Sequence, residues 1–328
     1  MSALSVLLLH AKYACTAIGA VWLGIKLLSA FFSSLVAAST PKRNLKKLGE
    51  WAVVTGATDG IGKAIAACLA KKQMSVLLVA RNKQRLDETA KELKGLTKGL
   101  VKTVDVDFSK SAEEVYAKLG GALKDLEVGV LVNNVGLSYP HAKFYYELDS
   151  QYVDDLIELN VRSVLRTTHL VYKGMCDRKK GAILSISSAA AVLPSDPLYC
   201  AYSGTKAAAE AFSRSLAEEC RGKNVLVQCQ VPLLVTSKLS KVKRSSIFCP
   251  DPATYAKAAL DCLERGDTQS TVVSPYFWHT AQYWLVSLMP VKLWHYIRLG
   301  QTLDIRKRAL KKAEREAAEG GEKSKKGE

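Results

Sequence analysis

The sequence lacks the residue patterns that mark several common classes of protein. Its eight cysteines, at positions 15, 68, 176, 200, 220, 229, 249 and 262, form no C-x-x-C pair. Several lie within apolar runs, where a free thiol packs as a small hydrophobic group. This spacing argues against a disulfide framework and against a metal site, and it is typical of a protein in a reducing compartment. We therefore expect no bound metal.

Signatures of nucleic-acid binding are also missing. The chain has no zinc-finger spacing, no RNA-binding signature and no stripe of arginine interleaved with aromatic residues. It nevertheless carries a formal charge of +16, from 47 Lys and Arg against 31 Asp and Glu. We expect no nucleic-acid partner. Such an excess of positive charge favours other anions: a phosphorylated cofactor, an acyl-CoA or an anionic membrane surface.

Charge is nearly absent from residues 13–38, where Lys26 is the only charged side chain. This run is long enough to cross a bilayer as a helix. Lys26 near its middle would cost roughly 2.5–3.5 kcal/mol on insertion scales, which a tilted or interfacial helix would reduce. The basic cluster at positions 42, 43, 46 and 47 should stay cytosolic. We expect residues 1–48 to form a membrane-anchor helix and a basic linker; a signal peptide cleaved near Ala38 is the alternative.

The C-terminal part has a second uncharged run, at residues 268–291, and three of the five tryptophans fall at positions 278, 284 and 294. Clustered aromatic residues suit a membrane interface, although an apolar cap over a substrate pocket would look the same. Residues 306–328 are highly charged, and we expect them to be frayed or disordered. Lys325-Lys326 near the end matches the dilysine retrieval signal of the endoplasmic reticulum. We therefore assign residues 276–328 to a membrane-associated segment and a basic tail.

Between these ends, residues 49–275 alternate between short β-branched runs and longer amphipathic ones. The expected strands are 51–55, 75–80, 100–105, 128–132, 182–187, 225–230 and 271–274. The expected helices are 63–72, 84–94, 112–124, 152–172 and 202–221. Apolar strands separated by helices predict a doubly wound parallel sheet of the Rossmann type, covered on both faces. Ligands of such folds bind beyond the carboxyl ends of the strands.

A glycine-rich turn follows the first expected strand. Gly56, Gly60 and Gly62 form a G-x-x-x-G-x-G array that precedes a helix. Glycine lets the backbone approach a diphosphate, and the helix N-terminus offers free amides to it. After the second strand comes Arg81, where enzymes that select NAD usually place an acid. A guanidinium can grip a 2′-phosphate instead, so we expect NADPH as the cofactor.

The sharpest motif is Tyr202-x-x-x-Lys206 in the helix before the sixth strand. Residues four apart on a helix share one face, so the phenol and the ammonium should be neighbours. A nearby cation should lower the pKa of Tyr202 toward a value useful in proton transfer. The pair therefore predicts acid–base chemistry at the end of the sheet.

These motifs together resemble the short-chain dehydrogenase/reductase family. The resemblance rests on the glycine array, Asn133–Gly136, Asn160, Ser188 and Tyr202–Lys206, and covers roughly residues 50–275. Further stretches resemble the membrane-bound 3-oxoacyl-CoA reductases of fatty-acid elongation, especially those of plants; the related 17β-hydroxysteroid dehydrogenases share much of the pattern. These stretches are Gly49–Gly56, Asp105–Ser109, Gly136–Pro140, Val227–Pro232 and Tyr255–Ala259.

The resemblance implies roles for the matching positions. Tyr202 would give a proton to the carbonyl oxygen as NADPH delivers hydride, and Lys206 would hold the nicotinamide ribose. Ser188 would polarise the carbonyl, with Ser187 as the alternative, and Asn160 would hold a water linked to Lys206. The other implied cofactor contacts are Thr58, Asp59, Ile61, Asp107 at the adenine, Asn133 steadying the central strand, and Thr236 at the carboxamide.

The resemblance also implies a substrate and a location. We expect reduction of a 3-oxoacyl-CoA in very-long-chain fatty-acid elongation, at the endoplasmic reticulum membrane, with the catalytic domain facing the cytosol and other elongase components as partners. A steroid or other lipid-ketone reductase is the alternative, and a non-catalytic membrane scaffold is an alternative of another class. The loop after the sixth strand carries cations that would engage CoA phosphates or face lipid or water. They are Lys238, Lys241, Lys243 and Arg244.

Overall fold

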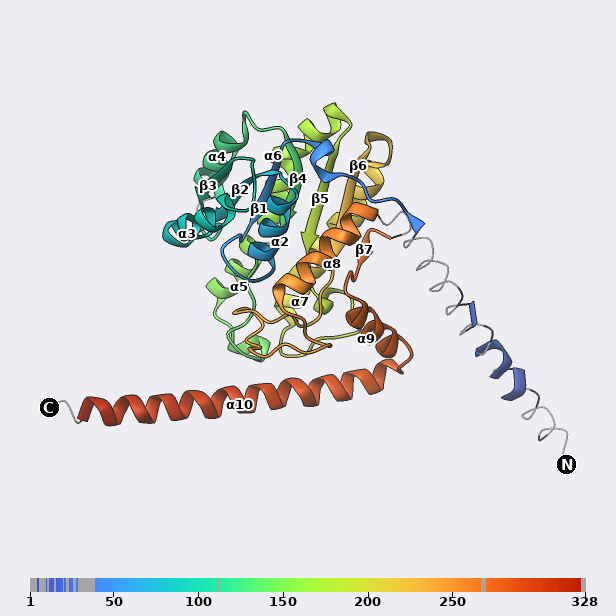
Figure 1. Cartoon of the computed structure of the whole chain (residues 1–328). Coiled ribbons are helices and arrows are strands. Elements are labelled where there is room, and N and C mark those ends of the chain that lie inside the picture. Colours follow the sequence, from blue (N-terminus) through green and yellow to red (C-terminus); the bar gives the residue numbers. More distant parts are fainter. Residues whose placement is uncertain are drawn as a thin grey trace.

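The computed structural model describes residues 39–110, 112–266 and 270–325, together with scattered positions between 5 and 28 (Figure 1). Most of the expected anchor at 13–38, Lys26 included, lies outside the described residues. Within the described part, no helix is both long and apolar enough to cross a membrane.

The core of the fold is a seven-stranded parallel sheet in the order β3-β2-β1-β4-β5-β6-β7. The doubly wound Rossmann-type sheet expected from the sequence is therefore confirmed. The strands are β1 (Trp51–Thr55), β2 (Ser75–Ala80), β3 (Val101–Asp105), β4 (Val128–Asn133), β5 (Gly181–Ile186), β6 (Val225–Gln230) and β7 (Val272–Val273).

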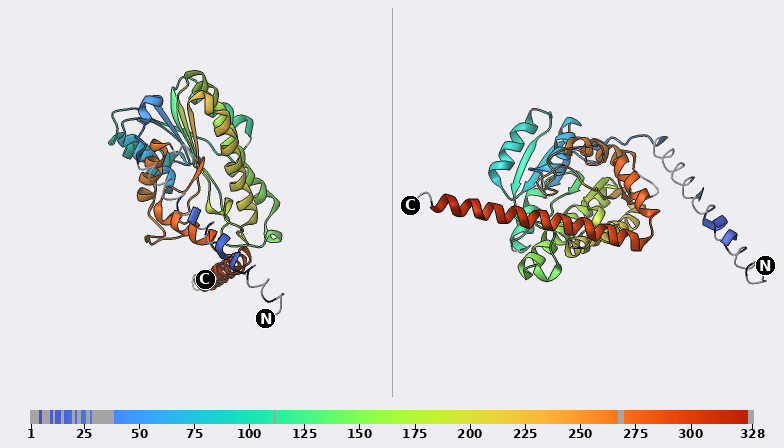
Figure 2. Two further views of the ribbon diagram at one scale, coloured as in Figure 1. Left: turned by 90° about the vertical axis from the view of Figure 1, so that its right-hand side faces the viewer. Right: turned by 90° about the horizontal axis from the view of Figure 1, so that it is seen from below.

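Helices cover both faces of the sheet, because alternate strand residues point to opposite sides (Figure 2). Val54 of β1 belongs to the core shared with α2, α3 and α8, whereas Val53 belongs to the core shared with α4, α6 and α7. The helices are α2 (Gly60–Lys71), α3 (Lys83–Lys94), α4 (Ala112–Leu123), α5 (Ser150–Ile157), α6 (Ser163–Arg178), α7 (Cys200–Glu219), α8 (Pro252–Arg265), α9 (Phe277–Ser287) and α10 (Val291–Lys325).

One expected helix, at 152–172, is interrupted. Glu158–Arg162 forms a π-helical turn between α5 and α6. Such a turn inserts an extra residue into the helical repeat, and π turns are frequent at functional sites. Here it carries Asn160, whose side chain is fully buried.

The charged tail does not have the expected disorder. The expectation for residues 306–328 is wrong up to Lys325, because α10 continues to that residue. The start of α10 is held against the domain: Trp294 donates from Nε1 to the Ser195 carbonyl at 2.9 Å, and the Arg298 guanidinium lies 2.7 Å from the Asp196 carboxylate. Figure 2, seen from below, shows α10 crossing the width of the domain.

A second ion pair holds α10 farther along. Arg306 binds Glu147 through both guanidinium branches, with the Nη1–Oε2 distance at 2.7 Å. Glu147 belongs to the loop after β4, and Asp196 to the loop after β5. The helix therefore crosses the carboxyl edge of the sheet, where the ligands of this kind of fold bind.

The Arg298–Asp196 ion pair should contribute measurably to the attachment of α10 and so to the stability of the fold. The Asp196 side chain is 8% exposed, and burial raises its pKa despite the neighbouring guanidinium. Arg298→Met would leave a buried carboxyl without its partner and should lower the free energy of unfolding by about 3 kcal/mol. Lys312→Met is the matched control, because it removes an exposed pair with Glu316 and should change stability little. Denaturant unfolding measures both; equal effects would contradict this account of α10.

Candidate functional site

The glycine-rich turn between β1 and α2 forms a close-fitting cradle. Gly56 and Gly60 have φ angles of +65° and +52°, which glycine adopts without strain. Gly62 has a different reason to be glycine. A Cβ there would stand 2.3 Å from Nδ2 of Asn134 and 2.5 Å from the Gly56 carbonyl oxygen. Asp59 caps α2 by accepting the Gly60 amide at 2.7 Å, so the helix N-terminus opens directly onto the turn.

Asn134 braces this cradle, a role that the sequence did not reveal. Its Nδ2 donates to the carbonyls of Thr55 and Gly56, at 3.1 and 3.2 Å, and its backbone amide donates to the Thr55 hydroxyl at 3.0 Å. Asn133, the residue assigned to steady the central strand, donates instead to the Thr168 hydroxyl in α6 at 2.9 Å. The doubled asparagine was visible in the sequence, but not which of the two faces the glycine turn.

Tyr202 and Lys206 lie in the first two turns of α7, beside the carboxyl end of β5. Lys206 is buried, and its Nζ donates to the carbonyl of Ile186, the last residue of β5, at 3.1 Å. Burial lowers the pKa of Lys206 to about 8. Gly136 makes room for it, because a Cβ there would stand 3.2 Å from the ammonium nitrogen.

The pKa of Tyr202 is raised, whereas the sequence led us to expect a lowered value. Burial raises it to about 12, and a hydrogen bond with the Ser188 side chain opposes this effect without cancelling it. The expectation of a lowered pKa is therefore wrong, because desolvation of the phenolate dominates. Tyr202 is consequently protonated at neutral pH.

The two serines at the end of β5 face different partners. The Ser187 hydroxyl donates to the Lys206 carbonyl at 2.8 Å within the core. The Ser188 hydroxyl accepts the Ala190 amide at 3.2 Å and interacts with the Tyr202 phenol. This geometry favours Ser188 over Ser187 as the serine that acts on a substrate.

Asn160 joins the site through the π turn. Its side chain accepts the Leu137 amide and donates to the Leu137 carbonyl, both at 2.8 Å, and it donates to the Thr205 hydroxyl at 3.0 Å. These bonds fix the segment after β4 against the helix that carries Tyr202 and Lys206. The proposed link through water from Asn160 to Lys206 stays a prediction.

The remaining predicted cofactor contacts follow the same edge of the sheet. Arg81 directly follows β2 and is exposed, and Asp107 lies two residues beyond β3, where its carboxylate accepts the Ser109 amide and hydroxyl. Thr58 and Ile61 lie within the glycine turn and are half-buried. Thr236 lies in the loop after β6 and donates its amide to the Pro250 carbonyl at 3.0 Å.

Helix α9 supports the loop after β6, which the sequence did not predict. His279 is buried; its Nδ1 accepts the Leu233 amide at 3.3 Å, and its Nε2 lies 3.2 Å from the Leu234 carbonyl. Burial lowers the pKa of His279, which keeps the ring neutral and suits one acceptor and one donor nitrogen. A lone histidine in an aromatic run carries no sequence signal of this contact.

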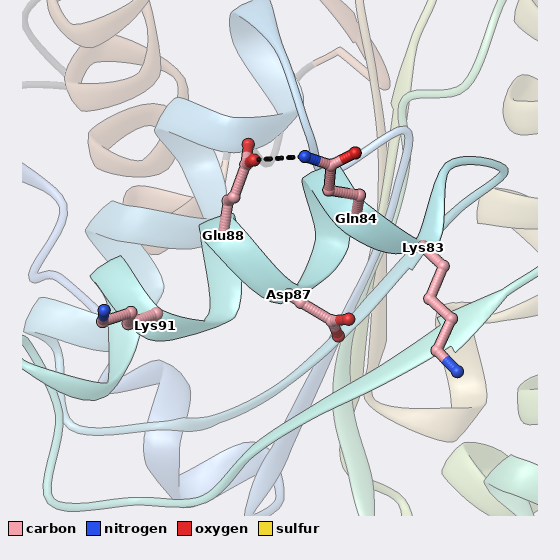
Figure 3. A pocket seen from close by; sticks show the side chains of 5 residues that line it. All are labelled: Lys83, Gln84, Asp87, Glu88 and Lys91. Atoms are coloured by element: carbon pink, nitrogen blue, oxygen red, sulfur yellow. Dashed lines mark hydrogen bonds between the residues drawn. The ribbon is translucent and has the colours of Figure 1, made fainter.

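A separate hollow lies on α3 (Figure 3). All of its lining residues come from that one helix, and Gln84 donates to Glu88 across it at 3.3 Å. It contains none of the candidate site residues, and we assign it no role in binding.

Comparison with known proteins identifies the family of this chain. Residues 50–247 match the model of the short chain dehydrogenase family, the stretch that contains the glycine cradle, Tyr202 and Lys206. The chain belongs to the short-chain dehydrogenase family. This dehydrogenase is accordingly an oxidoreductase, and its fold and glycine cradle fit a nicotinamide cofactor.

Several curated relatives of this dehydrogenase carry the same name. A very-long-chain 3-oxoacyl-CoA reductase-B of Danio rerio is 38% identical over 302 residues, which cover 90% of this chain and 95% of the relative. A very-long-chain 3-oxoacyl-CoA reductase of Coprinopsis cinerea is 41% identical over 283 residues, covering 84% and 83%. The one of Homo sapiens is 39% identical over 272 residues, covering 82% and 84%.

Solved structures agree on the fold. An alcohol dehydrogenase from Thermococcus sibiricus, complexed with 5-hydroxy-NADP, is 28% identical with a TM-score of 0.61 and covers 69% of this chain and 95% of its own. A short-chain dehydrogenase from Sphingobium yanoikuyae in complex with NADPH has a TM-score of 0.63 at 24% identity, covering 78% and 96%.

The cradle predicts a selective effect of added bulk. Gly62→Ala must displace the Asn134 side chain or the Gly56 carbonyl, so we expect NADPH affinity to fall about tenfold or more, equivalent to at least ~1.4 kcal/mol. Gly121→Ala in α4 is the control: a Cβ there meets nothing within 4 Å, and the helix should gain stability. Fluorescence titration with NADPH measures both variants. Unchanged affinity in Gly62→Ala would refute this role of the cradle.

Proposed function

We propose that this dehydrogenase reduces the 3-keto group of a very-long-chain 3-oxoacyl-CoA to a hydroxyl, with NADPH as the reductant, in fatty-acid elongation. The observation that carries the proposal is its identity of about 40% with reductases of that name over more than four fifths of both chains. The arrangement of Tyr202, Lys206, Ser188 and Asn160 at one edge of the sheet supports catalysis rather than a scaffold role.

The cofactor would lie along the carboxyl edge of the sheet. The positive-φ glycines and the N-terminus of α2 fit a diphosphate, and Arg81 after β2 fits a 2′-phosphate better than a bare ribose. Asp107 and Thr236 are placed to contact the adenine and carboxamide ends. When bound, NADPH supplies the hydride that the carbonyl carbon accepts.

The side chains of this chain would supply the proton. Ser188 donates a hydrogen bond to the carbonyl oxygen, which holds it beside the Tyr202 phenol. As the carbon gains hydride, Tyr202 transfers its proton to that oxygen, and the product is the 3-hydroxy compound. The buried Lys206 ammonium stabilises the phenolate left behind, which a pKa of about 12 would otherwise make costly.

We further propose a location at the endoplasmic reticulum membrane, facing the cytosol, with other elongase components nearby. Residues 13–38 would anchor the chain in the bilayer. The exposed apolar side chains of α9 and α10 are consistent with contact to lipid, for example Phe277, Leu285 and Tyr296, which are 70%, 66% and 80% exposed.

Microsomes that contain this chain test the function. Given NADPH and a long-chain 3-oxoacyl-CoA, they should form the 3-hydroxyacyl-CoA, and Tyr202→Phe should lower kcat by a factor of at least ~100, since general acid catalysis contributes that much. The activity should remain in the membrane pellet after an alkaline carbonate wash. Turnover of a steroid ketone but of no 3-oxoacyl-CoA would overturn the proposed substrate, and full activity in Tyr202→Phe would overturn the mechanism.

The pH dependence follows from the two opposite pKa shifts. Lys206 is charged below its pKa of about 8 and neutral above it, whereas Tyr202 stays protonated to about 12. We therefore expect kcat/KM for reduction to be highest below pH 8 and to fall as the pH rises through that value. Lys206→Arg keeps its charge, so any residual activity should lose this alkaline decline. A decline at the same pH in Lys206→Arg would assign it to another group.

A further inference from the structure

The loop between β6 and α8, residues 231–251, is held firmly at its two ends. The Tyr283 hydroxyl of α9 donates to the Val231 carbonyl at 2.8 Å, and His279 accepts the Leu233 amide. At the far end, the Tyr276 hydroxyl donates to the Ile247 carbonyl at 2.9 Å. Helix α9 thus fixes where this loop leaves and rejoins the domain.

The part between those ends contains a compact turn. The Ser240 hydroxyl donates to the Val235 carbonyl at 2.6 Å and accepts the Ser237 amide at 3.1 Å. Thr236, the proposed partner of the carboxamide, lies inside this turn. Leu239, in the same turn, is 49% exposed. The turn therefore carries a cofactor contact but lies on the surface of the domain.

An ion pair joins this turn to the glycine cradle. Nζ of Lys238 lies 3.2 Å from Oδ2 of Asp59, while Oδ1 of Asp59 caps α2. The two segments also approach directly, since a Cβ on Gly60 would stand 3.4 Å from Cβ of Ser237. The pair thus connects the segment that would hold the diphosphate to the segment that would hold the nicotinamide end.

The energetics of the pair point to a role in binding rather than in folding. The side chains of Lys238 and Asp59 are 69% and 44% exposed. A pair so exposed contributes little to the stability of the fold. It does connect the surface turn that carries Thr236 to the N-terminus of α2. It also neutralises a carboxylate that stands at the edge of a site for a diphosphate.

We propose that Lys238 is a positioning residue for the cofactor: its ion pair with Asp59 ties the turn that carries Thr236 to the glycine cradle and slows the release of NADPH. This proposal takes only the identity of the cofactor, NADPH, from the proposed function. It does not depend on which substrate is reduced. Lys238 therefore acts through Asp59 and the turn, and not by holding a phosphate itself.

A double-mutant cycle tests this assignment. Lys238→Met removes the charge, and Asp59→Asn removes the partner while keeping a side chain that caps a helix as well as aspartate does. Each variant should weaken NADPH binding about fivefold, in line with a surface ion pair, and the double variant should be no weaker than either one. Lys238→Arg should restore most of the affinity. Lys173→Met, which breaks an exposed pair with Asp177 in α6, is the matched control and should bind NADPH like the parent chain.

The readouts are the Kd from NADPH fluorescence and the dissociation rate from stopped flow, on the full chain without any acyl-CoA. The losses should appear mainly as faster dissociation. Fully additive losses would show that Lys238 contacts the cofactor directly, and tighter binding in Asp59→Asn would show that Asp59 acts by repulsion; either result overturns the proposal. Coupled losses in a protein that reduces no 3-oxoacyl-CoA would support the ion pair while refuting the proposed substrate.

Discussion

The site depends on the burial of one ammonium group. Lys206 is 4% exposed, and its Nζ has the Ile186 carbonyl as a hydrogen-bond acceptor at 3.1 Å. A buried charge is costly unless it is hydrogen-bonded, so the surroundings must be shaped closely around it. Gly136 leaves the space, and the π turn brings Asn160 beside that same glycine. The π turn that carries Asn160 and the glycine at position 136 therefore both accommodate the buried Lys206 ammonium.

The same desolvation keeps Tyr202 in the protonated form. Burial raises the pKa of Tyr202 and lowers that of Lys206, because both groups are driven toward the uncharged form. A neutral phenol can give up a proton but cannot accept one, which suits reduction of a carbonyl. Groups whose environments move their pKa values apart are the ones to which acid and base roles are assigned. Protonated Tyr202 thus has the proton that reduction of a carbonyl requires.

The sequence predicted what depends on local pattern. The bounds of β1, β2 and β6 match the expected ranges at both ends. For β1 and β2 the reason is a near-continuous apolar run, which leaves little freedom in placing a buried parallel strand. The glycine turn and the Tyr202–Lys206 pair could be predicted because their chemistry requires these residue types at this spacing. Contacts between distant segments were not predicted, since nothing near His279 in the sequence indicates a hydrogen bond to Leu233. The direction of the Tyr202 pKa shift also needed the burial of the site.

The C-terminal helices show how a local pattern can mislead. The charge density of residues 306–325 resembled a disordered tail, yet α10 continues through them, and Trp294, Arg298 and Arg306 attach the first half of this helix to the domain. Both helices lie beyond residue 247, where the family match ends, whereas the relative from Danio rerio covers 90% of the chain. Their contacts converge on the loops after β4, β5 and β6, at the carboxyl edge of the sheet. The C-terminal helices thus help to fix the edge of the sheet at which Tyr202 and Lys206 lie.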